Sequence, residues 1–180
     1  MRRKSICITA LLLLTLATPL VGKSAVFDHY THALGVQGGR LAGFGASYQK
    51  WYPSFGFQIA GGAFFHPNME EGRDRFAYNI GAEVQYPLIS HTITSFLAGR
   101  VYLAAGLHHR RYQEAEGDET IGYTPADIVT QFGAGAGIGV ETVLFEHFSL
   151  GTEFVYIGLY TTDGTIDVEM SPQLSIRYRF

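Results

Sequence analysis

The last fifteen residues of the chain alternate between apolar and polar side chains with a period of two. The apolar row, read back from the C-terminus, comprises Phe180, Tyr178, Ile176, Leu174, Met170, Val168 and Ile166, and Pro172 alone interrupts it. Successive side chains of a β-strand point to opposite faces, so a period of two is typical of a strand. The pattern predicts a long strand with one face in an apolar medium and the other in a polar one.

Similar patterns predict seven further strands, so the expected fold is all-β. The clearest of them has Phe76, Tyr78 and Ile80 alternating with Ala77 and Asn79. The eight predicted strands cover residues 30–38, 42–52, 55–65, 75–88, 95–111, 128–145, 148–161 and 165–180.

The predicted connections alternate in length. Short ones are expected at 53–54, 89–94 and 146–147, longer ones at 66–74 and 112–127, and the last hairpin turns at 162–164. Transmembrane β-barrels have short periplasmic turns and longer external loops. The alternation therefore predicts a barrel with both termini on the periplasmic side, although the connection expected at 39–41 is short for an external loop.

Residues 1–25 have the pattern of a secretory signal peptide. Arg2, Arg3 and Lys4 precede an apolar stretch over 6–20, and small residues follow it. The stretch is shorter than the roughly 20 residues of a transmembrane helix, although a retained anchor is the alternative. Cleavage is expected after Ser24 or Ala25, and residues 26–180 are expected to form a single domain.

The charge of the mature chain argues against nucleic acid as a partner. Removal of the signal segment leaves nine Lys and Arg residues against sixteen Asp and Glu residues, whereas nucleic acid requires a basic surface. The single cysteine lies in the signal segment, so no disulfide is expected. The seven histidines form no zinc-binding motif, and we expect neither a metal nor a cofactor.

Glycines and aromatic residues fit a narrow barrel. Gly133, Gly135, Gly137 and Gly139 occupy one face of a predicted strand, where they would make room for larger side chains across the interior. A bulged or poorly specified strand is the alternative. Aromatic residues gather near strand ends, as in the girdles that mark membrane interfaces.

The C-terminal pattern of Leu174, Ile176, Tyr178 and the terminal Phe180 resembles the assembly signal of bacterial outer-membrane β-barrels. With the signal peptide, the strand number and the loop asymmetry, the mature chain resembles the small eight-stranded barrels of the OmpA/OmpX type. This resemblance implies an eight-stranded antiparallel up-and-down transmembrane β-barrel. It also implies outer-membrane lipid and the barrel-assembly machinery as partners. Members of this group have diverse roles, so the resemblance implies location more than activity.

The interior of an eight-stranded barrel is just wide enough for its own side chains, so we expect no open pore. A turn near His91 would place Glu83 opposite Arg100. A lipid-facing arginine would cost about 2–4 kcal/mol near the midplane, whereas an interior charge needs a partner. We therefore predict an interior ion-pair network. Its members are Glu83, Arg100, Glu141, Glu153 and Arg177.

Two other functions remain open. The fragment His147-Phe148-Ser149 resembles the His-x-Ser spacing of outer-membrane lipid A deacylases, which are also eight-stranded barrels. Here Leu150 stands where those enzymes have Asn, and the fragment falls at a predicted periplasmic turn. A periplasmic barrel that carries a small apolar ligand is the third possibility, and it requires the aromatic faces to point inward.

Two predicted external loops are acidic. Their acidic residues are Glu70, Glu71, Asp74, Glu114, Glu116, Asp118 and Glu119. Such loops could bind an external ligand or divalent cations, or form a solvated rim. The spacing is not that of an EF-hand. The overall prediction is a non-enzymatic outer-membrane barrel with a structural or surface-interaction role.

Overall fold

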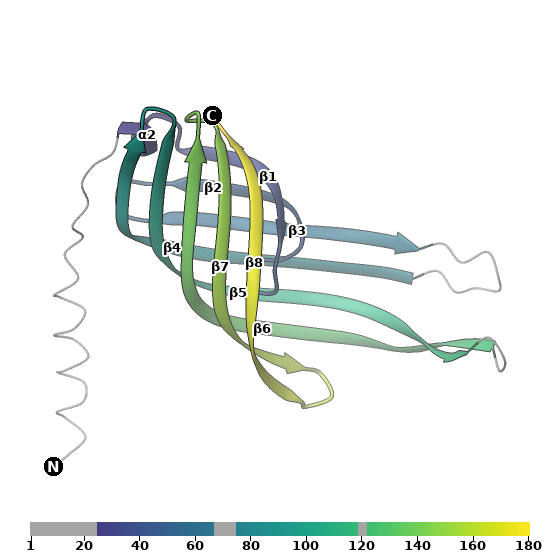
Figure 1. Cartoon of the computed structure of the whole chain (residues 1–180). Helices are drawn as coiled ribbons and strands as arrows, with labels where there is room; N and C mark the ends of the chain where they lie inside the picture. Colours follow the sequence, from purple (N-terminus) through teal and green to yellow (C-terminus); the bar gives the residue numbers. More distant parts are fainter. Residues whose placement is uncertain (1–24, 67–74, 119–121) are drawn as a thin grey trace, which may run out of the picture.

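The computed structural model describes residues 25–66, 75–118 and 122–180, and these form a short helix and a closed barrel (Figure 1). The helix is α2 (Ala25–His29), and the strands are β1 (His32–Gly38), β2 (Gly45–Trp51), β3 (Gly56–His66), β4 (Arg75–Thr94), β5 (Leu97–Asp118), β6 (Gly122–Leu144), β7 (Phe148–Thr161) and β8 (Ile166–Arg179). Each strand pairs antiparallel with its neighbour in sequence, and β8 pairs with β1. The predicted eight-stranded up-and-down barrel is confirmed.

The two ends of the barrel differ. Helix α2, the C-terminus and the tight connections after β2, β4 and β6 lie at one end, which we call the turn end (Figure 1). The β3–β4 and β5–β6 hairpins project from the opposite end, which we call the hairpin end. Among the residues that the structure describes, no helix is long and apolar enough to cross a membrane.

Several predicted boundaries were wrong. Strand β4 continues to Thr94 and the turn falls at residues 95–96, because pairing with β5 extends through the segment predicted as a connection at 89–94. Pairing also continues between β5 and β6 as far as Asp118 and Gly122. The backbone of Glu114, Glu116 and Asp118 is therefore in a strand and not in a loop. The predicted signal peptide up to residue 24, Glu70, Glu71, Asp74 and Glu119 lie outside the described residues.

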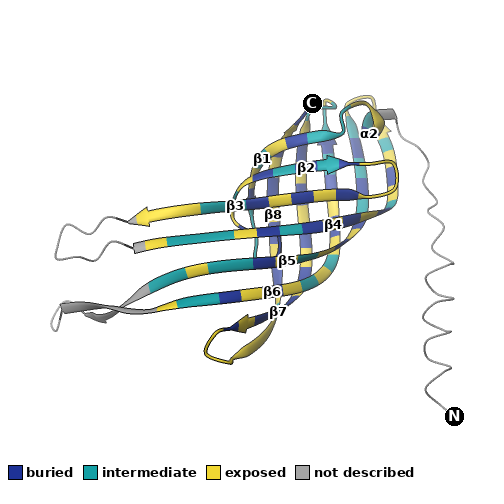
Figure 2. Ribbon diagram, turned by 180° about the vertical axis from the view of Figure 1, so that it is seen from behind, coloured by how far each residue is buried: buried dark blue, intermediate teal, exposed yellow. Residues whose placement is uncertain are grey.

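The two faces of the barrel wall have opposite character. In β7, Phe148, Phe154 and Tyr156 point outward and are more than half exposed, whereas Ser149 and Glu153 point into the interior and are buried. Figure 2 shows the same alternation of buried and exposed positions around the barrel. Because most aromatic residues of the wall face outward, with Trp51 and Tyr102 as inward-facing exceptions, the requirement of the apolar-ligand carrier is not met.

The glycine-rich strand makes room for large side chains, but these belong to the neighbouring strands β5 and β7 and not, as predicted, to strands across the interior. A Cβ built on Gly139 would overlap the Tyr102 ring, 2.5 Å from Cε2, and one on Gly133 would lie 2.9 Å from Cδ1 of Ile157. These glycines therefore make room for large side chains in the interior.

Gly139→Ala is expected to lower the free energy of unfolding by about 1–3 kcal/mol, which is typical of overpacking a close-packed site. The added methyl group would displace Tyr102, whose hydroxyl donates to Glu153 over 2.6 Å. Urea unfolding in lipid vesicles would measure the loss. Gly158→Ala is the control, because its Cβ would meet nothing closer than 3.9 Å. Equal losses in the two variants would contradict the steric explanation.

Candidate functional site

The five residues of the predicted ion-pair network are all buried inside the barrel. The predicted pairing of Glu83 with Arg100 is wrong, because the register places Glu83 opposite Gly106 and Arg100 opposite Ser90. The error arose because the turn lies nearer Phe96 than His91. Arg100 instead forms an ion pair with Glu141 on the neighbouring strand, with 3.6 Å between Nη1 and Oε2.

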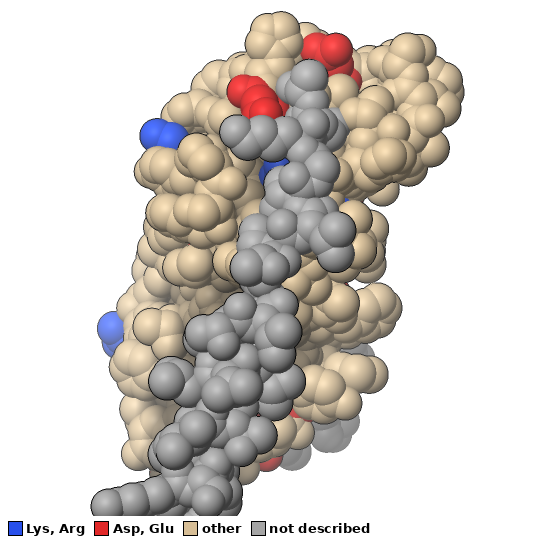
Figure 3. Space-filling model, turned by 90° about the vertical axis from the view of Figure 1, so that its left-hand side faces the viewer, with Lys and Arg blue, Asp and Glu red and all other residues tan. Residues whose placement is uncertain are grey.

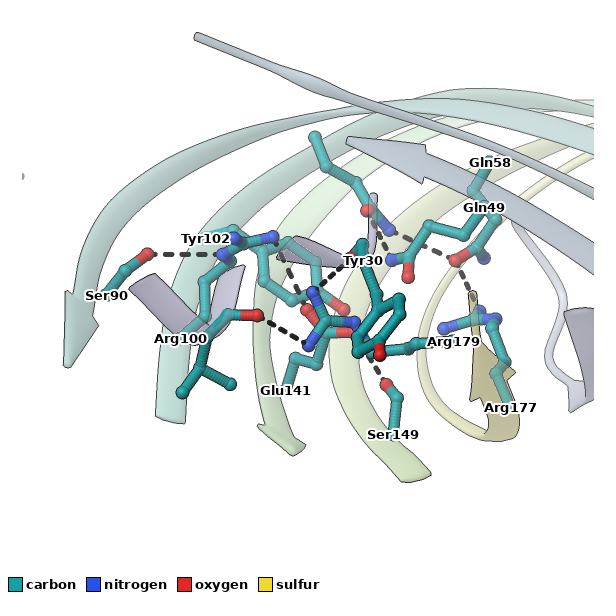
Figure 4. Close-up of polar contacts among 12 residues, drawn as sticks. Tyr30, Gln49, Gln58, Ser90, Arg100, Tyr102, Glu141, Ser149, Arg177 and Arg179 are labelled. Carbon is teal, nitrogen blue, oxygen red and sulfur yellow. Dashed lines mark hydrogen bonds and ion pairs between the residues drawn. The ribbon is translucent and has the colours of Figure 1, made fainter. Parts of the chain in front are cut away.

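The Arg100 guanidinium is enclosed on several sides. Its Cζ lies over the rings of Trp51 and Phe27, at 3.8 and 4.0 Å from their centroids, and Nε donates to Ser90 over 3.2 Å. Figure 4 shows Arg100, Glu141 and Ser90 converging in the interior. Cation–π contacts of this kind strengthen when the cation is desolvated. Arg100 therefore contributes both an ion pair and packing contacts at this position.

The other predicted members of the network bind amides and hydroxyls. Glu153 accepts hydrogen bonds from Tyr102 (2.6 Å) and Gln173 (2.5 Å), and Gln85 donates to both Glu83 (2.6 Å) and Glu153 (3.3 Å). Arg177 donates to Ser47, Gln37 and Gln58. In the described part of the chain, Arg100–Glu141 is the one ion pair of the interior. A network of all five as ion pairs is not formed.

Sequence reasoning missed the interior glutamines. Hydrogen bonds connect four of them, Gln37, Gln49, Gln58 and Gln85, and Gln173 joins this layer through Glu153. The alternation that placed Glu83 and Arg177 on inward faces also applies to these glutamines, so their positions could have been found. Because buried polar groups need partners, the layer satisfies charges that have no counterion in contact.

Helix α2 closes the turn end. Phe27 is buried against Ala98 and Val143. Arg179 donates to the backbone oxygens of Val26, Tyr30 and Glu146, which ties the segment to the last strand. No sequence pattern indicated this closure.

The β1–β2 connection, residues 39–44, folds into the barrel at the hairpin end. Leu41 is fully buried against Val155, Ile157 and Leu159. The Gln173 side-chain oxygen accepts hydrogen bonds from the backbone N–H groups of Leu41 (2.9 Å) and Ala42 (3.0 Å). The reversal of the chain uses positive φ angles at Gly43 (101°) and Gly45 (133°), which glycine adopts without steric cost. Both ends of the interior are thus covered by residues of this chain.

His147 and Ser149 do not face each other. The Ser149 hydroxyl is buried in the interior and donates to Glu141 over 2.6 Å. His147 lies in the turn before β7, with Nδ1 2.9 Å from the backbone oxygen of Arg179 and its ring stacked on Tyr178. Because His147 precedes the strand, the rule that residues two apart share a face does not apply. This geometry does not support the deacylase-like arrangement.

The C-terminal residues form the outer face of the closing strand. Leu174, Ile176 and Tyr178 are about half or more exposed, and β8 pairs with β1 from Leu174 to Arg179. The terminal Phe180 also packs near His32, with ring centroids 5.9 Å apart. Within the described residues, no group of three or more His, Cys, Asp or Glu side chains could hold a metal ion.

No protein-family model and no curated protein matches this sequence. Among solved structures, the fold is similar to the N-terminal β-barrel domain of Pseudomonas aeruginosa OprF, with 18% identity, a TM-score of 0.52, and coverage of 84% of this chain and 98% of that one. Weaker matches are Ail, the attachment invasion locus protein of Yersinia pestis (14% identity, TM-score 0.37, 83% and 97% coverage), and CarO of Acinetobacter baumannii (9%, 0.39, 85% and 99%).

The similarity to the OprF domain concerns the fold alone, since the two sequences are only 18% identical. The closed ring of strands and this similarity together confirm the resemblance predicted from the sequence. This chain has the fold of the small eight-stranded outer-membrane β-barrels.

Proposed function

We propose that the protein is an integral outer-membrane barrel with a closed interior and a structural or surface-interaction role, and that it is not an enzyme. The observation that carries the proposal is the apolar outer wall. Aromatic and aliphatic side chains cover the outside of the strands, and most of the visible side of the barrel in Figure 3 is tan, with the few charged groups mainly near its ends and along its edge. An exposed apolar surface of this extent exceeds that of soluble monomers and matches the lipid-facing band of a membrane barrel.

The polar interior supports the same proposal. Charged and amide side chains lie inside, Leu41 covers them at the hairpin end, and Phe27 covers them at the turn end. An interior filled in this way favours a structural barrel over a diffusion pore. The proposed partners are outer-membrane lipid around the wall and the barrel-assembly machinery, which would recognise the outer face of β8.

We propose that the hairpin end faces the outside of the cell. A short epitope inserted at Gly164, in the exposed turn between β7 and β8, is expected to be labelled by a non-permeant antibody on intact cells. The matched control is the same epitope between Pro53 and Ser54, in an exposed turn at the opposite end, which is expected to be labelled only after lysis. Labelling of the control alone would reverse the orientation. Labelling of neither on intact cells, with both proteins folded, would overturn the surface role.

A further inference from the structure

A basin lies at the hairpin end, outside the buried Leu41. It contains two cavities of about 280 Å³ and 560 Å³, which share Arg40, Arg110 and Tyr112 in their walls. The smaller cavity lies between the β1–β2 connection and the inner faces of β3, β4 and β5. Its volume is near the lower limit of cavities that bind small molecules.

Two residues that line the smaller cavity each have a buried polar atom without a partner. The side chain of His108 is buried, and its Nδ1 contacts the backbone oxygen of Arg40. A carbonyl oxygen only accepts, so Nδ1 carries the proton, and Nε2 of the neutral ring is an unused acceptor. Arg110 Nε is buried and is an unused donor. Buried groups without partners carry a free-energy cost that a bound ligand would remove.

The charge of the smaller cavity is positive. Arg40 is neutralised by Glu169, with 3.2 Å between Nε and Oε1. Arg110 forms no ion pair within the described residues, and its guanidinium lies 4.5 Å from the centroid of the Tyr112 ring. None of the described residues that line this cavity is acidic, whereas Asp163, Asp167 and Glu169 line the larger one. The smaller cavity therefore suits a ligand with an anionic group.

Part of the remaining wall is aromatic. Phe44 and Phe64 lie with ring centroids 5.8 Å apart, and both line the cavity. The negative faces of such rings attract the C–H groups of a sugar. A sugar hydroxyl would donate to His108 Nε2, and a carboxylate or phosphate would accept from Arg110. We propose that the smaller cavity binds an anionic saccharide, a sugar that carries a carboxylate or a phosphate, through Arg110 and His108.

The first test uses the purified protein in detergent micelles and saturation-transfer NMR. Glucuronate and glucose 6-phosphate are expected to bind, glucose to bind at least about tenfold more weakly, and inorganic phosphate to compete poorly. The tenfold figure corresponds to the loss of one charge-assisted hydrogen bond. If glucose bound as tightly as the acidic sugars, the Arg110 cation would have no role in binding. Equal affinity for inorganic phosphate would reduce the site to a general anion site, and no binding of either acidic sugar would refute the proposal.

Substitutions of residues that line the smaller cavity test whether the ligand binds there. Arg110→Gln is expected to weaken glucuronate binding about tenfold or more, whereas Lys50→Gln, which removes one positive charge near the turn end, should leave it unchanged. Phe64→Leu should weaken binding of the acidic sugars and leave that of inorganic phosphate unchanged, because only the sugar contacts the ring. Circular dichroism would verify that each variant is folded. Unchanged binding in Arg110→Gln would place the ligand elsewhere.

The proposed saccharide site rests on the proposed function in one respect only, namely that a ligand would reach the cavity from outside the cell. Binding to the purified barrel does not depend on which way the barrel crosses a membrane. Failure of binding with Gly164 labelled on intact cells would overturn the saccharide site alone. Binding without such labelling would overturn the orientation alone.

Discussion

Arg100→Ala is expected to lower the free energy of unfolding by about 3–5 kcal/mol, which is typical when one member of a buried ion pair is removed. The substitution leaves the Glu141 carboxylate buried without its cation. It also removes the guanidinium that packs between Trp51 and Phe27. Urea unfolding in lipid vesicles, followed by circular dichroism, measures the loss without relying on the fluorescence of Trp51, which the substitution itself would change.

A double-mutant cycle separates the ion pair from the packing. Arg100→Ala combined with Glu141→Ala is expected to cost clearly less than the sum of the single losses, because the double variant buries neither charge. Arg110→Ala combined with Glu141→Ala is the matched control. Arg110 lies on the same strand and the same face but ten positions away, so its loss should add to that of Glu141→Ala. Additive losses in the first cycle would show that Arg100 acts by packing alone.

Ile138→Arg is expected to destabilise the protein in a lipid bilayer by about 2–4 kcal/mol, the cost of a lipid-facing arginine near the midplane of a barrel. Ile138 points outward from β6, about midway between the aromatic residues Phe132 and Phe145. With a rise of about 3.3 Å per residue, the position lies well inside an apolar band about 25 Å tall.

The same substitution at the edge of the wall is the control. Ile166 is also an outward-facing isoleucine, but it begins β8 at the hairpin end. Ile166→Arg is expected to cost only about 0–1 kcal/mol, as for arginine near an interface. Urea unfolding of both variants in vesicles of the same lipid gives the difference. Similar small losses at both positions would mean that this wall does not face lipid, and the membrane proposal would fail.

The outer wall could be predicted from the sequence because its signal is local. The alternation from Ile166 to Phe180 reports which side chains share a face, whatever lies across the barrel. The same holds for the inward positions of Glu83, Arg100 and Arg177. The register of the pairing between strands could not be predicted with the same accuracy. A shift of the β4–β5 turn by a few residues leaves each strand pattern intact but replaces Glu83 by Ser90 as the neighbour of Arg100.

The inner face of β7 also shows that contacts between distant segments could not be predicted from the sequence. Val155, Ile157 and Leu159 are apolar on a face that is otherwise polar, and the sequence offers no reason for it. The structure supplies one, since Leu41 of the β1–β2 connection packs against them. A connection that folds back into the interior leaves no periodic pattern, because its partners lie more than a hundred residues away in the chain.

By itself, the sequence determined the number of strands, their apolar outer faces and the closed antiparallel order, because these depend on side-chain alternation and on connections between neighbours. The tertiary structure alone decided the pairing of Arg100 with Glu141, the closure by Phe27 and Leu41, and the basin that brings His108 and Arg110 beside Phe44. These features are contacts between residues distant in sequence, and their geometry depends on the register and curvature of the whole barrel.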